Sequence, residues 1–220
     1  MTDIKLFGQF YNDALKLRAV VMTIPAIGPY LDLYFSDKGQ KYAQERIDYL
    51  LDSLQTEMQE VQDHLLNKEM LDSEEGFDLM QKTFSATVRT RQKTKIAVFA
   101  KILKGAFTTK SETHDPELYL RIVEELSERE LEIAFLLYSE KQKIKTDLSD
   151  LEKQESGNDA HWLSKKFPAY TKEEVEYCLP RIEKTRLFKE VVGSFIGYGG
   201  GNYNPTTLFS NFQNYIELNK

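Results

Sequence analysis

Two consecutive stretches of opposite charge decide the fold: residues 44–78 read QERIDYLLDSLQTEMQEVQDHLLNKEMLDSEEGFD, and residues 79–111 read LMQKTFSATVRTRQKTKIAVFAKILKGAFTTKS. The first contains eleven acidic residues and two basic ones, Arg46 and Lys68, whereas the second contains eight basic residues and no acid. Apolar residues recur at helical spacing in both, which predicts two long helices joined near residues 72–76. We expect an antiparallel helical hairpin, because it places the acidic helix beside the basic one.

The apolar stripe of each predicted helix marks the side that faces the core. In the first helix the stripe consists of Ile47, Leu50, Leu51, Leu54, Met58, Val61 and Leu65. In the second it consists of Phe77, Met80, Phe84, Val88, Ile96, Phe99, Leu103 and Phe107. Ser73, followed by Glu74 and Glu75, predicts the N-cap and acidic first turn of the second helix.

The second stripe is interrupted by RTRQKTK, residues 89–95, which we interpret as the exposed middle of a long helix or as a contact surface. The candidate contact residues are Arg89, Arg91, Lys93 and Lys95. In one interpretation they pair across the hairpin with Glu57, Glu60 and Asp63, and such surface pairs contribute about 0–1 kcal/mol each. In the other they bind an acidic partner, a nucleic-acid backbone or anionic lipid.

Composition and charge restrict the class of protein. The chain has 220 residues, a net charge of -6 and 41% hydrophobic residues, as expected of a globular protein with a real core. The electrostatic field of such a negatively charged chain does not favour binding to nucleic acid or to anionic membranes. Cys178 is the one cysteine, so no intrachain disulfide can form and we expect a reducing, cytoplasmic location. The first ten residues, MTDIKLFGQF, lack the pattern of a secretory signal.

The most apolar stretch is AVVMTIPAIGPYLDLYF, residues 19–35. A transmembrane helix needs about 20 uninterrupted apolar residues, and Pro25 and Pro29 interrupt this stretch. It is interpreted either as a buried, bent connector at the end of the hairpin or as a loop that dips into a membrane interface. The candidate membrane contacts are Ile24, Ile27, Tyr30 and Leu31.

Capping signals divide the second half of the chain into shorter helices. Asp115 before Pro116, Ser127 before Glu130, and Thr171 before Glu174 each predict a helix start. The run LFKEVVGSFIGYGGGNY, residues 187–203, predicts a β-hairpin with a glycine-rich turn. A closing helix follows, with Leu208, Phe212, Tyr215 and Ile216 on one stripe. We therefore predict a helical domain over residues 1–113 and a mixed α+β domain over residues 114–220.

The order of elements over residues 127–218 resembles a winged-helix domain. LSERELEIAFLLY resembles its first helix, TKEEVEYCLPRIEKTRLFKEV its recognition helix and first wing strand, and GYGGGNYNPTTLFSNFQNYI its wing tip, return strand and last helix. The N-terminal half is similar only to the front of uncharacterised bacterial proteins.

The resemblance implies DNA binding, with Lys172, Arg181, Lys184 and Arg186 as the candidate contacts. The charge count opposes it, because residues 171–186 contain four acids beside these four cations, and residues 193–205 contain no Lys or Arg. A winged helix that contacts protein is favoured over one that reads DNA.

Residues for catalysis or metal binding are not arranged in known patterns. His64, His114 and His161 are scattered, Cys178 has no adjacent base, and the GYGGG turn lacks the GK[ST] of a phosphate loop. We expect no cofactor, no metal and no enzymatic activity. The sequence thus predicts a mainly α, bacterial-type interaction protein that acts through protein contacts and forms a homodimer along the long helices. The alternatives are a DNA-binding regulator and a peripheral membrane protein.

Overall fold

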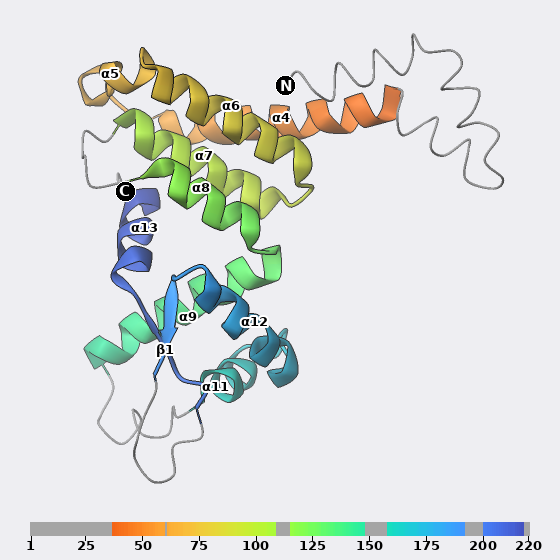
Figure 1. The fold of residues 1–220 in the computed structure, drawn as a ribbon, viewed down its shortest axis with the longest axis vertical. Helices are drawn as coiled ribbons and strands as arrows, with labels where there is room; N and C mark the ends of the chain where they lie inside the picture. The colour runs from red at the N-terminus through yellow and green to blue at the C-terminus, as the bar shows by residue number, and fades with distance from the viewer. Residues whose placement is uncertain (1–36, 60, 109–114, 148–157, 192–199, 218–220) are drawn as a thin grey trace, which may run out of the picture. The chain divides into compact units, whose positions relative to one another are not determined.

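The structure is a computed structural model that describes residues 37–59, 61–108, 115–147, 158–191 and 200–217. This part of the chain is mainly helical and has one two-stranded antiparallel sheet near its C-terminal end (Figure 1). The chain divides into two compact units, residues 1–112 and 113–220. The sequence placed this boundary after residue 113.

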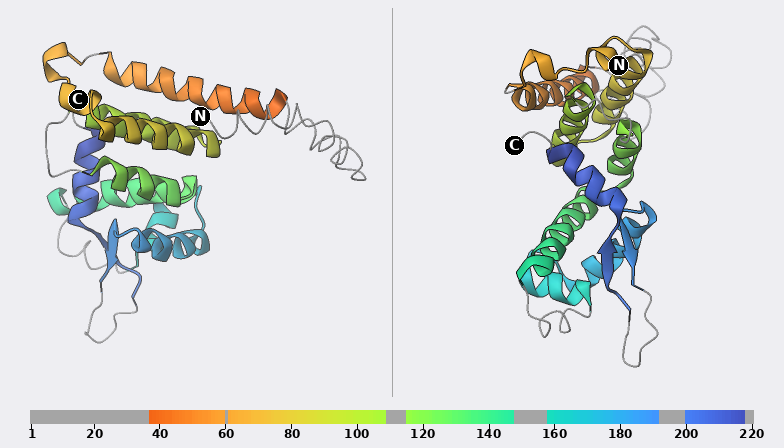
Figure 2. Two further views of the ribbon diagram at one scale, coloured as in Figure 1. Left: turned by 45° about the horizontal axis from the view of Figure 1, so that its top comes forward. Right: turned by 90° about the vertical axis from the view of Figure 1, so that its left-hand side faces the viewer.

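The first unit is built around one buried helix. Its elements are α4 (Asp37–Met58), the 3-10 turn η1 (Asp63–Leu65), α5 (Lys68–Leu71), α6 (Glu74–Arg89) and α7 (Lys93–Thr108). α4, α6 and α7 run alongside one another (Figure 2). The face of α7 that carries Ile96, Phe99 and Leu103 is buried, as the apolar stripe predicts.

The start of α6 is set by local chemistry that the sequence predicts correctly. The Ser73 hydroxyl accepts a hydrogen bond from the Gly76 backbone N–H at 3.0 Å, and Glu74 and Glu75 occupy the first turn. Gly76 also allows α6 to approach α5, since a Cβ atom there would lie 2.0 Å from the Met70 carbonyl oxygen. A larger residue at this position would force the two helices apart.

The predicted long helices are shorter in the structure. α4 ends at Met58, and the second stretch is two helices, because α6 ends at Arg89 and α7 begins at Lys93. The interpretation of residues 89–95 as the middle of one helix is therefore wrong. Thr90 adopts an extended conformation as the C-cap of α6, and its hydroxyl accepts a hydrogen bond from the Gln92 N–H.

Two contacts between the described parts of the acidic and basic stretches are well defined. Lys104 of α7 lies 3.3 Å from Glu57 of α4. Arg46 donates a hydrogen bond to the Val88 carbonyl oxygen at 2.5 Å. Glu57 thus pairs with Lys104 rather than with residues 89–95, and the side chains of Glu60 and Asp63 lie outside the described residues. Buried side-chain packing, more than ion pairing, holds these helices together.

The second unit combines helices with the small sheet. It contains α8 (Pro116–Glu125), α9 (Glu128–Asp147), α11 (Asp159–Lys166), α12 (Lys172–Lys184), β1 (Phe188–Glu190), β2 (Tyr203–Pro205) and α13 (Thr207–Glu217). β1 and β2 pair in an antiparallel ribbon (Figure 2). Phe188 lies opposite Pro205, and Glu190 lies opposite Tyr203. The predicted antiparallel hairpin is confirmed at this level, while residues 192–199 between the strands lie outside the described part.

The three predicted helix starts of this unit are confirmed. Asp115 accepts from the Leu118 N–H at 2.9 Å. Ser127 and Glu130, like Thr171 and Glu174, exchange reciprocal hydrogen bonds between side chain and backbone. Pro180, which conflicts with a continuous helix, is accommodated inside α12.

Arg186, just beyond the end of α12, has a backbone φ of 65°, a left-handed conformation that costs free energy in any residue but glycine. We expect Arg186→Gly to raise the free energy of unfolding by about 0.5–1 kcal/mol. The measurement is urea unfolding followed by the fluorescence of Trp162, the one tryptophan, which lies in this unit. As a control, Lys184→Gly at the last residue of α12 should instead lower the free energy of unfolding, by up to about 1 kcal/mol. Equal effects of the two changes would contradict the assignment.

Candidate functional site

Helix α12 has one buried face and one exposed face. Val175, Cys178, Leu179 and Ile182 are buried against the rest of the unit, as the sequence predicts. The opposite face is exposed and carries Glu173, Tyr177, Pro180, Arg181 and Lys184. The buried stripe fixes the rotation of the helix, so these five side chains form a defined surface, called here the α12 face.

Two of the four predicted winged-helix contacts on and beside this helix already have ionic partners. Lys172 lies 3.2 Å from Glu176, one turn further along. The guanidinium of Arg181 donates to the carboxylate of Glu130 on α9. The other two, Lys184 and Arg186, are exposed, and the described part of the chain gives them no ionic partner.

Glu130 is the anchor that holds Arg181. Its side chain is 3% exposed and also accepts the Ser127 backbone N–H at 2.7 Å. Burial alone would raise the pKa of Glu130, but hydrogen bonds from Ser127 and Arg181 outweigh burial, so the pKa lies below its ordinary value. The carboxylate therefore stays charged at neutral pH, and Arg181 remains bound to it.

Arg129 of α9 makes a second set of contacts, with the residues at the start of α12. It lies 3.7 Å from Glu174 and donates to the Ala169 carbonyl oxygen at 3.0 Å. Its guanidinium also lies 4.3 Å from the ring centroid of Tyr170. A backbone hydrogen bond from Thr171, with help from Arg129, holds the pKa of Glu174 below its usual value. These contacts tie α9 to the beginning of α12 and fix the orientation of its exposed face.

Tyr177, at the centre of the α12 face, is 67% exposed. The Arg181 guanidinium lies 5.6 Å from its ring centroid, which steadies the ring at the surface. Tyr177 is not among the candidate residues that the sequence predicts. Its position outside the buried stripe of α12 does indicate an exposed ring. Exposed tyrosines of this kind are enriched at protein interfaces.

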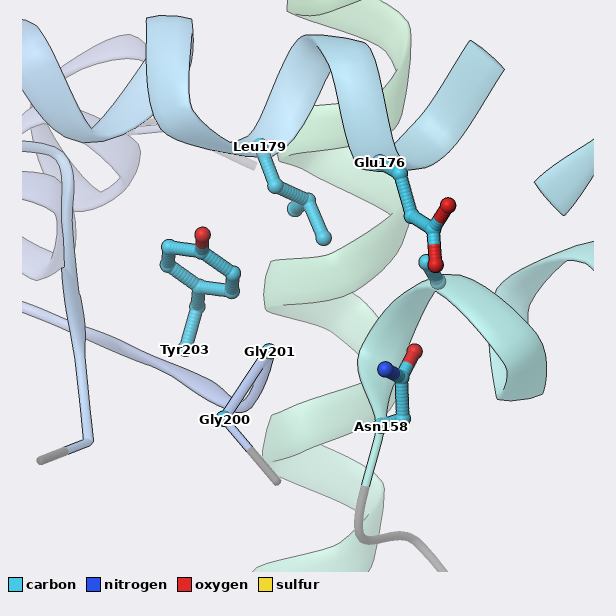
Figure 3. Close-up of a pocket in the computed structure, with 7 residues that line it drawn as sticks. Asn158, Glu176, Leu179, Gly200, Gly201 and Tyr203 are labelled. Atoms are coloured by element: carbon cyan, nitrogen blue, oxygen red, sulfur yellow. The ribbon is translucent and has the colours of Figure 1, made fainter. Parts of the chain in front are cut away.

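A small pocket of about 220 Å³ lies between the start of α11, α12 and the turn before β2 (Figure 3). It is lined by Asn158, Ala160, Glu176, Leu179, Gly200, Gly201 and Tyr203. Its one carboxylate belongs to Glu176, which is paired with Lys172. The lining offers no nucleophile with an adjacent base, and the volume is below the range typical of ligand sites.

A buried ion pair lies in the same region. Asp159 is fully buried, and its Oδ1 atom lies 2.7 Å from Nζ of Lys141 on α9. Its Oδ2 atom accepts the Tyr203 backbone N–H at 2.5 Å, and Lys141 also donates to Asn202 at 2.6 Å. These bonds join α9, α11 and β2. Both charges are therefore used to hold the unit together.

Cys178 lies on the buried face of α12. Its side chain is buried, and burial raises the pKa of the thiol, with a further increase from the nearby carboxylates of Glu130 and Glu174. Among the residues that the structure describes, no group of three His, Cys, Asp or Glu side chains is placed to hold a metal ion.

The predicted basic contact surface of the first unit is smaller than expected. Arg89, Arg91 and Lys93 are exposed, and Nζ of Lys93 lies 5.1 Å from the ring centroid of Tyr49. Lys95 is only 6% exposed. Lys95 must therefore be removed from the set of candidate contacts, because α7 turns it toward the interior of the unit.

The predicted membrane contacts Ile24, Ile27, Tyr30 and Leu31 lie outside the described residues. In the part of the chain that is described, no helix combines the length and apolar character needed to cross a bilayer.

No protein-family model, curated protein or solved structure matches this chain. The α12 face, with the exposed Tyr177 ring and its charged neighbours, is therefore the feature that bears on function.

Proposed function

We propose that this chain is a non-enzymatic interaction protein whose C-terminal unit is a winged-helix-type module that contacts protein through the α12 face. The order of the described elements α9, α11, α12, β1 and β2 supports this reading, because helices followed by an antiparallel strand pair form the order of the winged-helix domain that the sequence resembles. In that arrangement α12 takes the place of the recognition helix.

The observation that carries the proposal is the exposure of Tyr177 at the centre of the α12 face, on a helix where bases do not outnumber acids and two of the cations are ion-paired. Lys172 and Arg181 are ion-paired, and Glu173 and Glu174 lie in the first turn of the helix. DNA affinity comes from Lys and Arg that neutralise phosphates, and glutamates at the entering end of the helix oppose it. A protein partner can instead bury the tyrosine ring and satisfy both signs of charge.

Two measurements on the full chain test the proposal. We expect fluorescence anisotropy with a labelled random duplex at low salt to detect no binding at tens of micromolar protein, where nonspecific DNA binders with Kd of about 1–100 μM are visible. Saturable duplex binding would overturn protein contact in favour of a DNA-binding regulator.

The second measurement identifies the class of molecule that contacts the α12 face. With a photo-crosslinking amino acid at position 177, we expect protein adducts in cells. The same group at position 165, an exposed lysine of α11, is the matched control and should give none. Nucleic-acid adducts at position 177, or identical results at both positions, would contradict the proposal.

A further inference from the structure

Four residues of the α12 face lie on a single line along the helix. Glu173, Tyr177, Pro180 and Lys184 follow one another at spacings of four, three and four residues, which keeps them on one side of an α-helix. An acid stands at one end of this line, a base at the other, and two ring-bearing side chains between them. All four are exposed.

The charged side chains at the two ends of this line, Glu173 and Lys184, have no ionic partner in the described part of the chain. The structure gives the side chain of neither Glu173 nor Lys184 a hydrogen bond or ion pair among the described residues. They cannot pair with each other, because eleven residues of helix separate them by about 16 Å. This distinguishes them from Lys172, Glu174 and Arg181 on the same helix, which all have partners.

The line is complementary to itself. A second α12 laid against the first in the opposite direction, with a two-fold axis midway between Tyr177 and Pro180, brings Glu173 of each copy to Lys184 of the other. The same operation stacks Tyr177 of each copy on Pro180 of the other. In a two-fold interface every contact occurs twice, so both end charges and both rings find a partner at once.

We propose that the chain associates with a second copy of itself through antiparallel pairing of the α12 faces. This inference rests on the proposed function and specifies the protein partner. A foreign partner would not require the acid and the base to be placed symmetrically about Tyr177 and Pro180, whereas a second copy does.

The pairing is weak and reversible. A helix of 13 residues is about 20 Å long, so the contact falls short of the roughly 1,200–2,000 Å² buried by stable complexes. We expect dimerisation that depends on concentration in the range of tens to hundreds of micromolar and weakens at high salt, because exposed charges set the register.

Charge exchange tests the pairing by sedimentation equilibrium of the full chain. Glu173→Lys and Lys184→Glu should each weaken self-association about tenfold or more, because like charges then meet at both ends. An equimolar mixture of the two variants should associate again, since every contact joins opposite charges. The double variant should also self-associate. The control Lys165→Glu, on exposed α11 surface, should behave as the unchanged protein.

The outcomes separate this inference from the proposed function. A chain that stays monomeric throughout, or single variants that associate normally, or a mixture that is not restored, would overturn α12 pairing. None of these results affects the duplex titration or the crosslinks at position 177, which decide the proposed function. Circular dichroism checks folding, and if a reversal unfolds the unit, Glu173→Gln and Lys184→Gln replace it, each with an expected partial loss of association.

Discussion

Replacing Asp159 with alanine is expected to lower the free energy of unfolding by about 3–5 kcal/mol. The carboxylate is fully buried, and its partner Lys141 has a side chain only 9% exposed. Without Asp159, the ammonium group would remain buried with the Asn202 side-chain oxygen as its remaining partner, and the Tyr203 N–H would lose its acceptor. Leaving a buried charge uncompensated costs more than the pair itself contributes.

A double variant separates two free energies: the net contribution of the ion pair to stability, and the penalty of leaving one of its charges buried without a partner. Asp159→Leu with Lys141→Met removes both charges and keeps apolar volume, so the loss should be much smaller than for Asp159→Ala. Burial raises the pKa of the Asp159 carboxyl, although Lys141 opposes this increase, so the site penalises a charged group that is removed from water. Urea unfolding followed by Trp162 fluorescence measures both variants.

The matched control for this experiment is an exposed carboxylate of the same unit, Glu125 on α8. Glu125→Ala should change the free energy of unfolding by less than about 0.5 kcal/mol. A loss below about 1 kcal/mol for Asp159→Ala, or a double variant as damaged as the single one, would mean that water reaches the pair and that it does not hold α9, α11 and β2 together.

Features fixed by neighbouring residues could be predicted from the sequence. The starts of α6, α8 and α12 were found because a capping side chain reaches a backbone N–H only two or three residues away. The buried face of α12 was found because helical periodicity shows which side is apolar. In both cases the whole physical cause lies within a few residues of sequence.

Features fixed by distant residues could not be predicted. Asp159 and Tyr203 are 44 positions apart, and nothing local indicates that the aspartate accepts that N–H. A basic run does not reveal which of its members turns inward, so the sequence alone groups the buried Lys95 with its exposed neighbours. The helix break at Thr90 has no proline or glycine to announce it, so the packing of α6 and α7 decides it rather than propensity.

Replacing Phe209 with alanine should also cost about 3–5 kcal/mol of unfolding free energy. The sequence put Leu208 and Phe212 on the buried stripe of α13 and missed Phe209, which is fully buried, whereas Leu208 is half-buried. The Phe209 ring contacts other aromatic rings from α9, β1 and α13, at centroid distances of 4.6 Å to Tyr138, 5.1 Å to Phe188, 5.9 Å to Phe135 and 6.3 Å to Phe212.

The size of this loss follows from where the ring lies. Alanine removes the apolar area that joins α13 to α9 and β1 and leaves a cavity that the paired strands and their neighbouring helices cannot easily close. The aromatic pair energies, about 0.5–1.5 kcal/mol each, are lost in addition to the burial. Trp162 fluorescence during urea unfolding reports this loss, because the tryptophan belongs to the same unit.

Tyr177→Ala is the natural counterpart, since it removes an aromatic ring from the surface of the same unit. In dilute solution it should change the free energy of unfolding by less than about 0.5 kcal/mol. A large loss from Tyr177→Ala would mean that its ring supports the fold and is not free to contact a partner. A small loss from Phe209→Ala would mean that α13 is not part of the core. The pair of variants therefore distinguishes a buried aromatic residue that supports the fold of the unit from an exposed one that is available to a partner.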